Sequence, residues 1–117
     1  MHELSIAQSI LEIVQKEMTE RRLAEVKEIC VEVGALSGVL PDALQFSFEV
    51  IITDTPLAGC RFTIKEIPVR GNCQECDKDF EVKNFMFCCP FCNSGQIAVT
   101  SGEELDIAYL EVEEGVA

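Results

Sequence analysis

The sequence has few positive charges and many negative ones. Its 117 residues include 9 lysines and arginines against 21 aspartates and glutamates, which gives a formal net charge of −12. A surface of this sign repels phosphate backbones, so the composition argues against nucleic-acid binding. It favours cations and basic protein partners instead.

Long apolar runs are also missing. No stretch approaches the length needed to span a bilayer. The N-terminal segment has no basic start and is interrupted by polar residues, which is not the pattern of a signal peptide. An odd number of cysteines, seven in this chain, would be a hazard in an oxidising compartment. We therefore expect a cytoplasmic protein with no membrane partner.

Catalytic signatures are scarce as well. The chain has a single histidine, His2, so a hydroxyl or thiol nucleophile has no imidazole near it in the sequence. No glycine-rich phosphate loop occurs, which argues against nucleotide binding and hydrolysis. The sequence predicts a protein that is not an enzyme and has no catalytic residues.

What the chain does contain is two Cys-x-x-Cys pairs. Cys73 and Cys76 form the first pair, Cys89 and Cys92 form the second, and residues 77–88 separate them. This spacing lets two tight turns present four thiolates to one tetrahedral ion, most naturally structural zinc. Four cysteines close the coordination shell, so the site leaves no position for a substrate. Iron in the same cage and a redox role of the pairs are the weaker readings.

Three further cysteines lie outside these pairs. Cys88 abuts the second pair, but Cys89 rather than Cys88 has the right spacing to Cys92, so Cys88 is predicted to be a packing residue. Cys30 and Cys60 fall on predicted strands, where we expect them to act as small core side chains.

The N-terminus combines several nitrogen and oxygen donors. In Met1-His2-Glu3 the α-amino nitrogen, the His2 amide and imidazole nitrogens and the Glu3 carboxylate can all reach one ion. Such donors suit a tetragonal or square-planar metal, nickel(II) or copper(II). Ser5 and Gln8 have capping-box spacing. The first helix is therefore expected to begin near Ser5, which leaves Met1 to Glu3 as an exposed arm.

Hydrophobic periodicity gives the order helix, strand, helix, strand, ribbon, strand. The fold class this order predicts is α+β: a small mixed sheet with two helices, plus a zinc-ribbon module. Residues 1–69, completed by a C-terminal strand within 103–117, are expected to form one domain, and residues 70–102 the zinc ribbon. The predicted helices cover about 5–22 and 41–53, and the predicted strands cover 27–33, 60–69, 79–83, 96–100 and 105–112.

At its N-terminus and in its cysteine pairs the chain resembles the HypA/HybF family of hydrogenase nickel-insertion accessory proteins. The motifs that carry the resemblance are Met1-His2-Glu3-Leu4-Ser5, Val33-Gly34-Ala35-Leu36-Ser37, the two cysteine pairs and Gly102-Glu103-Glu104-Leu105. They occur in the family's order over essentially the whole chain.

The resemblance implies a nickel metallochaperone. It implies that His2 binds nickel(II), assisted by the terminal amine of Met1, backbone nitrogens and Glu3, and that Cys73, Cys76, Cys89 and Cys92 hold structural zinc. It also implies two partners, a HypB-type GTPase and the precursor of the hydrogenase large subunit, to which nickel is delivered. A homodimer stays open, because an exposed strand edge can pair or remain free. The alternative function is a zinc-ribbon adaptor that binds protein and has no specific nickel site.

Overall fold

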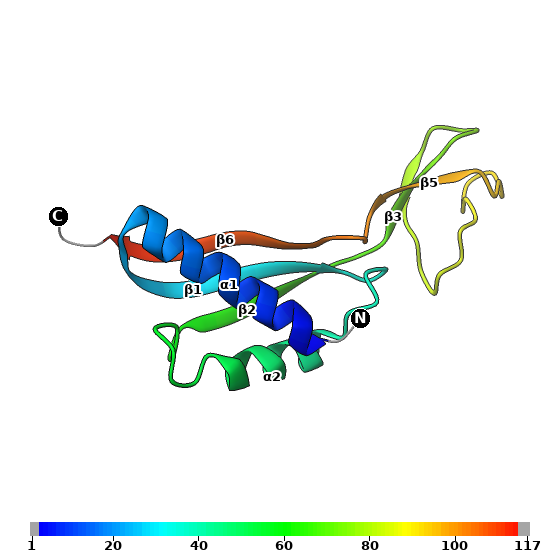
Figure 1. Ribbon diagram of the computed structural model, residues 1–117. Coiled ribbons are helices and arrows are strands. Elements are labelled where there is room, and N and C mark those ends of the chain that lie inside the picture. The colour runs from blue at the N-terminus through cyan, green and yellow to red at the C-terminus, as the bar shows by residue number, and fades with distance from the viewer. Residues whose placement is uncertain (1–2, 115–117) are drawn as a thin grey trace.

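The computed structural model describes residues 3–114, which form two helices and two small sheets (Figure 1). This arrangement confirms the predicted α+β class. The molecule is elongated, with extents of 58 × 29 × 17 Å. No helix in the described part of the chain is long and apolar enough to cross a membrane. In chain order the elements are α1 (Glu3–Arg21), β1 (Leu23–Gly34), α2 (Pro41–Ile51), β2 (Arg61–Ile67), β3 (Arg70–Cys73), β4 (Asp79–Glu81), β5 (Ile97–Ser101) and β6 (Leu105–Glu114).

The first sheet has the strand order β2-β1-β6. β1 and β2 are parallel, because α2 carries the chain back between them, and β6 returns antiparallel to β1. This return of the last strand to the early strands is what the sequence predicted. Register with β1 places Leu105, Ile107, Leu110 and Val112 beside its buried residues Val33, Val31, Ile29 and Val26.

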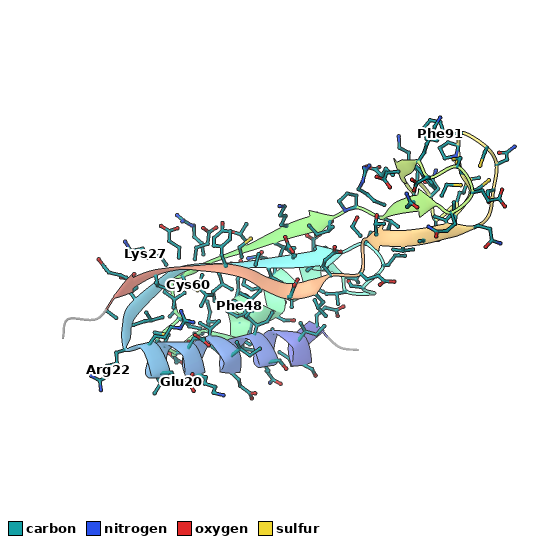
Figure 2. The ribbon with its side chains drawn as sticks, turned by 90° about the horizontal axis from the view of Figure 1, so that it is seen from above. Glu20, Arg22, Lys27, Phe48, Cys60 and Phe91 are labelled. Carbon is teal, nitrogen blue, oxygen red and sulfur yellow. The ribbon has the colours of Figure 1, made fainter. Side chains whose placement is uncertain are left out.

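One face of this sheet is covered by the two helices (Figure 2). The largest fully buried side chain is Phe48 of α2, whose ring stacks on that of Phe62 with centroids 4.2 Å apart. From α1, Ile6, Ile10 and Val14 recur at helical spacing and join the same cluster. The amphipathic stripe predicted for α1 is therefore core.

α1 begins at Glu3 rather than near Ser5, so the expectation that Glu3 belongs to an exposed arm is wrong. An acidic side chain is favoured in the first turn because it opposes the positive end of the helix dipole. The Glu3 carboxylate also accepts a hydrogen bond of 3.2 Å from the backbone N–H of Leu40. Leu40 is the N-cap residue of α2 and makes no side-chain capping bond of its own. In a capping box, a glutamate accepts a hydrogen bond from the N-cap N–H of its own helix. Glu3 of α1 makes the same bond to the N-cap residue of a different helix, α2.

The second sheet, β4-β3-β5, forms the ribbon at the far end of the molecule. It is small: its buried cluster consists of two cysteines and three other side chains, Val69, Phe80 and Val82. A core of this size cannot offset the chain entropy of ordering the ribbon, so a bound metal has to supply folding energy. The division into domains at residues 69/70 and 102/103 stays a prediction.

The two sheets meet at the loop that follows β1. Gly34 and Leu36 donate backbone hydrogen bonds of 2.7 Å each to the carbonyls of Glu104 and Gly102, and Ala35 donates one of 3.0 Å to Ile67. The side chain of Leu36 packs against the ribbon's buried cluster. The end of β2 and the segment between β5 and β6 are therefore both hydrogen-bonded to residues 34–36.

Candidate metal centre

The first cysteine pair lies on a tight turn at the end of β3. Cys73 N–H donates to the Lys78 carbonyl at 3.0 Å, and Asp77 N–H donates to the Cys73 carbonyl at 2.8 Å. The Cys76 N–H points at the Cys73 sulfur, 3.5 Å away. Asp77 has φ +58, a conformation that Asp tolerates better than most residues.

The second pair repeats this turn. Cys89 N–H donates to the Ser94 carbonyl at 2.8 Å, and Asn93 N–H donates to the Cys89 carbonyl at 2.9 Å. A backbone N–H again points at the first sulfur of the pair, here from Phe91 at 3.4 Å. Asn93 has φ +65. Sequence reasoning used Asp77 and Asn93 only as polar neighbours that fit zinc better than iron, and it missed their role in the turns. The signal was present, because each pair has Asp or Asn four positions after its first cysteine and these residues favour the left-handed region.

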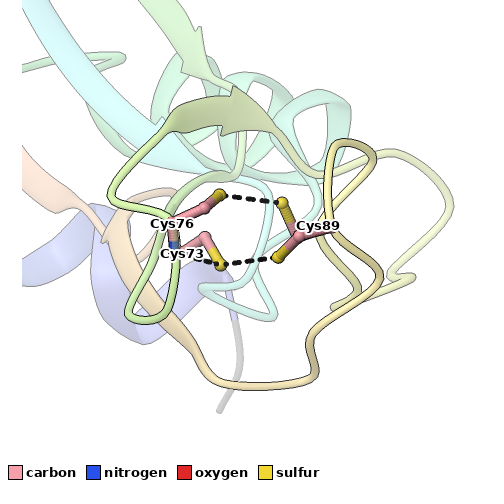
Figure 3. Close-up of side chains that lie close together, drawn as sticks. Cys73, Cys76 and Cys89 are labelled. Carbon is pink, nitrogen blue, oxygen red and sulfur yellow. Dashed lines mark hydrogen bonds between the residues drawn. The ribbon is translucent and has the colours of Figure 1, made fainter.

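The two turns bring four sulfurs together (Figure 3). The Sγ atoms of Cys73 and Cys92 are 3.5 Å apart, those of Cys76 and Cys89 are 3.6 Å apart, and all four lie within 4.8 Å of one another. A tetrahedral zinc ion with bonds of about 2.3 Å holds its sulfurs about 3.8 Å apart. The donor set and its dimensions therefore fit a structural zinc site.

Four thiols this close do not ionise alike. Backbone N–H donation, chiefly from Cys76, lowers the pKa of Cys73 to about 6. Burial opposes ionisation of Cys89, yet the N–H groups of Phe91 and Cys92 lower its pKa overall. Burial and the neighbouring sulfurs raise the pKa of Cys76. Although Ser94 N–H donation lowers it, the pKa of Cys92 is raised to about 12 by the other thiols. A divalent cation removes this conflict, because all four groups can then be thiolates.

Cys73 and Cys89 are fully buried, whereas Cys76 is half-buried and Cys92 is exposed. Within residues 3–114, no second group of three or more Cys, His, Asp or Glu side chains has metal-binding geometry. A closed set of four sulfurs offers no position for a substrate, which is the mark of a structural rather than a catalytic site.

The cysteines outside the pairs behave differently from one another. Cys88 is exposed, with its sulfur 3.5 Å from the Asn93 carbonyl oxygen, so the prediction that it is a packing residue is wrong. The turn directs Cys89 inward and its neighbour outward. Cys30 is buried, and Cys60 is half-buried against the main core, where burial raises the pKa of its thiol.

Of the predicted nickel ligands, Met1 and His2 lie outside the described residues. Glu3 lies inside them, at the start of α1, where its carboxylate accepts a hydrogen bond from the backbone N–H of Leu40, the N-cap residue of α2. Figure 1 shows the start of α1 at the end of the first sheet that is nearer the ribbon. Sequence reasoning missed the contact with Leu40, because no local pattern relates two residues 37 positions apart.

Two helices on one face of a small mixed sheet, joined to a ribbon with four clustered thiols, define a small metal-binding α+β protein. The sequence profile described as "Hydrogenase/urease nickel incorporation, metallochaperone, hypA" matches residues 1–112. The chain therefore belongs to the HypA family of nickel metallochaperones, which act in hydrogenase maturation.

The chain is also similar to proteins described as hydrogenase maturation factors. It is 46% identical over 113 residues to the hydrogenase maturation factor HypA of Geobacter metallireducens, covering 97% of this chain and 100% of the relative. It is 41% identical over the same shares to hydrogenase maturation factor HypA 2 of Bradyrhizobium diazoefficiens. Its fold matches the solution structure of the nickel metallochaperone HypA from Helicobacter pylori with a TM-score of 0.68, at 20% identity, over 98% of this chain and 100% of that one.

Proposed function

We propose that this protein binds nickel(II) at its N-terminus and delivers it to the precursor of the [NiFe]-hydrogenase large subunit. Membership of the HypA family is the observation that carries the proposal. The chemistry of Met1-His2-Glu3 supports it, because this tripeptide holds the chain's only imidazole beside a terminal amine and a carboxylate. The protein acts as a carrier in the cytoplasm and not as an enzyme.

The ligands we assign to nickel are the Met1 amine, the His2 imidazole and amide nitrogens, and the Glu3 carboxylate. The contact of Glu3 with the Leu40 N–H supports this arrangement, since it holds the carboxylate at the N-terminal ends of both helices. A terminal site with few protein ligands gives moderate affinity, so a receiving protein can compete for the ion. Copper(II) binds such donors at least as tightly, so selectivity for nickel has to come from availability and handover.

In this proposal zinc is held by Cys73, Cys76, Cys89 and Cys92 and stays with the protein. Its role is to stabilise the ribbon, because the ribbon's apolar cluster is too small to do so alone. The partners are a HypB-type GTPase and the large-subunit precursor. Nucleic acid and membranes are not partners, in keeping with the net charge of −12.

The test is a calorimetric nickel titration of zinc-loaded protein with a native N-terminus, beside His2→Ala and a chain extended by one glycine. We expect about one equivalent for the wild type, loss of binding in His2→Ala and weaker binding in the extended chain. Affinity should also fall as pH drops through about 6.5, because the imidazole must be deprotonated to bind metal. Equal binding by all three proteins would refute the N-terminal site.

That outcome would favour the alternative, a zinc-ribbon adaptor without a specific nickel site. Because the chain has one histidine, the imidazole proton signals in an NMR spectrum report on this residue alone. A loss or shift of these signals at one nickel equivalent supports the metallochaperone. Unchanged signals with zinc fully retained support the adaptor.

A further inference from the structure

β6 lies at the edge of the first sheet, and neither helix packs mainly on it. The strand order β2-β1-β6 leaves its outer edge unpaired within the described part of the chain. α1 packs on β1 and on α2, and α2 packs on β2. Figure 1 shows β6 along the side of the sheet that is away from α2. The helical layer is therefore one element narrower than the sheet beneath it.

An apolar groove follows from this mismatch. A hollow of about 510 Å³ lies between α1 and β6, lined mainly by apolar side chains that include Ile10, Ile13 and Ile107. A second hollow of about 430 Å³ shares Ile13 and Ile107 and extends the groove toward Val112, where the ion pair of Arg21 and Glu17 also lines it. The Ile13 side chain is 52% exposed at the mouth of the groove. The apolar surface thus runs along β6 beside Ile10, Ile13 and Ile107 and ends at the ion pair of Arg21 and Glu17.

The opposite face of β6 is acidic. Its register with β1 places Asp106 beside Glu32, Tyr109 beside Cys30 and Glu111 beside Glu28, which alternate with the apolar residues of the strand. Asp106 and Tyr109 also border the two hollows at the edge of the strand. β6 spans Leu105–Glu114 and carries no basic residue. The nearest cation on this face is Arg61 of β2, 3.3 Å from Glu111, and it comes from the far edge of the sheet. An added strand would therefore meet apolar side chains on one face and carboxylates on the other.

Charges on an edge strand often serve only to prevent self-pairing. Here they explain why a second copy of this chain is a poor occupant: two β6 strands side by side would bring their acidic rows together in a chain of net charge −12. The same charges do not explain the apolar groove on the other face. A partner strand with apolar side chains on one face and basic side chains on the other can fill the groove and pair with the carboxylates.

We propose that the free edge of β6 binds an extended segment of another protein, in which apolar residues alternate with lysine or arginine. The segment adds to the sheet as a fourth strand through backbone hydrogen bonds. Its apolar side chains enter the groove beside Ile13 and Ile107, and its basic side chains lie beside Asp106 and Glu111. None of the proposed nickel ligands is among the residues of this surface, so the proposal does not depend on the nickel site.

The probe is a dye-labelled ten-residue peptide of alternating valine and lysine, titrated into zinc-loaded full-length protein at 0.15 M salt. The control peptide has the same composition in two blocks, five valines and then five lysines. We expect the alternating peptide to bind about tenfold more tightly or better, because only its pattern fits both faces. Hydrogen exchange then has to show new protection of backbone amides in Leu105–Glu114. Equal binding of the two peptides, or binding without this protection, would overturn the proposal.

Two variants test the groove itself. Ile13→Lys places a charge at its mouth, and Val50→Lys places the same charge on α2, at a side chain that is 53% exposed. Both positions are surface sites, so both variants should fold. We expect Ile13→Lys to weaken the alternating peptide about tenfold and Val50→Lys to change it less than about twofold. Equal effects would refute the groove, and so would a wild-type dimer in sedimentation that Ile13→Lys dissociates, since a second copy would then occupy the edge. A failed nickel titration would leave these outcomes unchanged.

Discussion

Replacing Gly34 with alanine should destabilise the junction between the two sheets. Gly34 ends β1 where the segment that returns from the ribbon crosses it. A Cβ atom at this position would lie 2.1 Å from the Gly102 carbonyl oxygen, 2.2 Å from its carbonyl carbon and 2.7 Å from the Glu103 nitrogen. All three neighbours are backbone atoms, so no side-chain rotation can relieve the contact.

The expected loss has two parts. Overpacking of a closely packed site costs about 1–3 kcal/mol. The backbone must also move where Gly34 and Leu36 donate their 2.7 Å hydrogen bonds, and weakening these two bonds costs up to about 1 kcal/mol each. Together the loss is about 1–5 kcal/mol. At about 4 °C per kcal/mol for a domain of this size, the melting temperature should fall by about 4–20 °C.

Gly95→Ala is the matched control, because a Cβ there would have no heavy atom within 4 Å and the backbone has no positive φ. Thermal unfolding of zinc-loaded wild type, Gly34→Ala and Gly95→Ala, followed by circular dichroism, gives the comparison. Gly95→Ala should change the melting temperature by no more than about 2 °C. A Gly34→Ala protein that melts together with this control would refute the close-packed crossing.

Three further predictions follow from the core, the ribbon and the polar face of the sheet. Phe48→Ala should cost about 3–5 kcal/mol in urea unfolding, because it empties a fully buried site and removes the stacking on Phe62; a loss below about 1 kcal/mol would contradict this packing. Removing the metal with a chelator should collapse the amide NMR signals of residues 70–101 and leave those of α1 and β1 in place, whereas an unchanged spectrum would show that the ribbon folds without metal. Hydrogen bonding from Thr63 is the main cause that lowers the pKa of Glu28 below 4.5, with Arg61 adding to it and burial opposing it. The stabilisation of the folded state by the ionised Glu28 carboxylate is therefore present above pH 4.5 and is lost as pH falls through the lowered pKa. The difference in melting temperature between wild type and Glu28→Gln should shrink from pH 6 to pH 3. A constant difference would argue that the ionised carboxylate does not cause it.

Local patterns in the sequence were enough to predict most of the elements. The apolar stripe of α1 and the alternation in β1 arise from side-chain periods of 3.6 and 2, which are properties of the backbone and need no tertiary information. The cysteine spacing predicted the ribbon for a similar reason, since a Cys-x-x-Cys turn is a local structure. Where the prediction was wrong, at Glu3 and Cys88, the outcome depended on a distant contact or on which way a turn faces.

The sequence by itself determined that two turns can present four thiolates, and that nitrogen and oxygen donors gather at Met1, His2 and Glu3, because those groups are adjacent along the chain. Only the tertiary structure decided that Glu3 contacts Leu40, that Gly34 lies against Gly102, and that β6 is left as an uncovered edge. The physical reason is the same in each case. Such contacts join residues far apart in the chain, and they depend on how helices and strands pack rather than on what each segment favours alone.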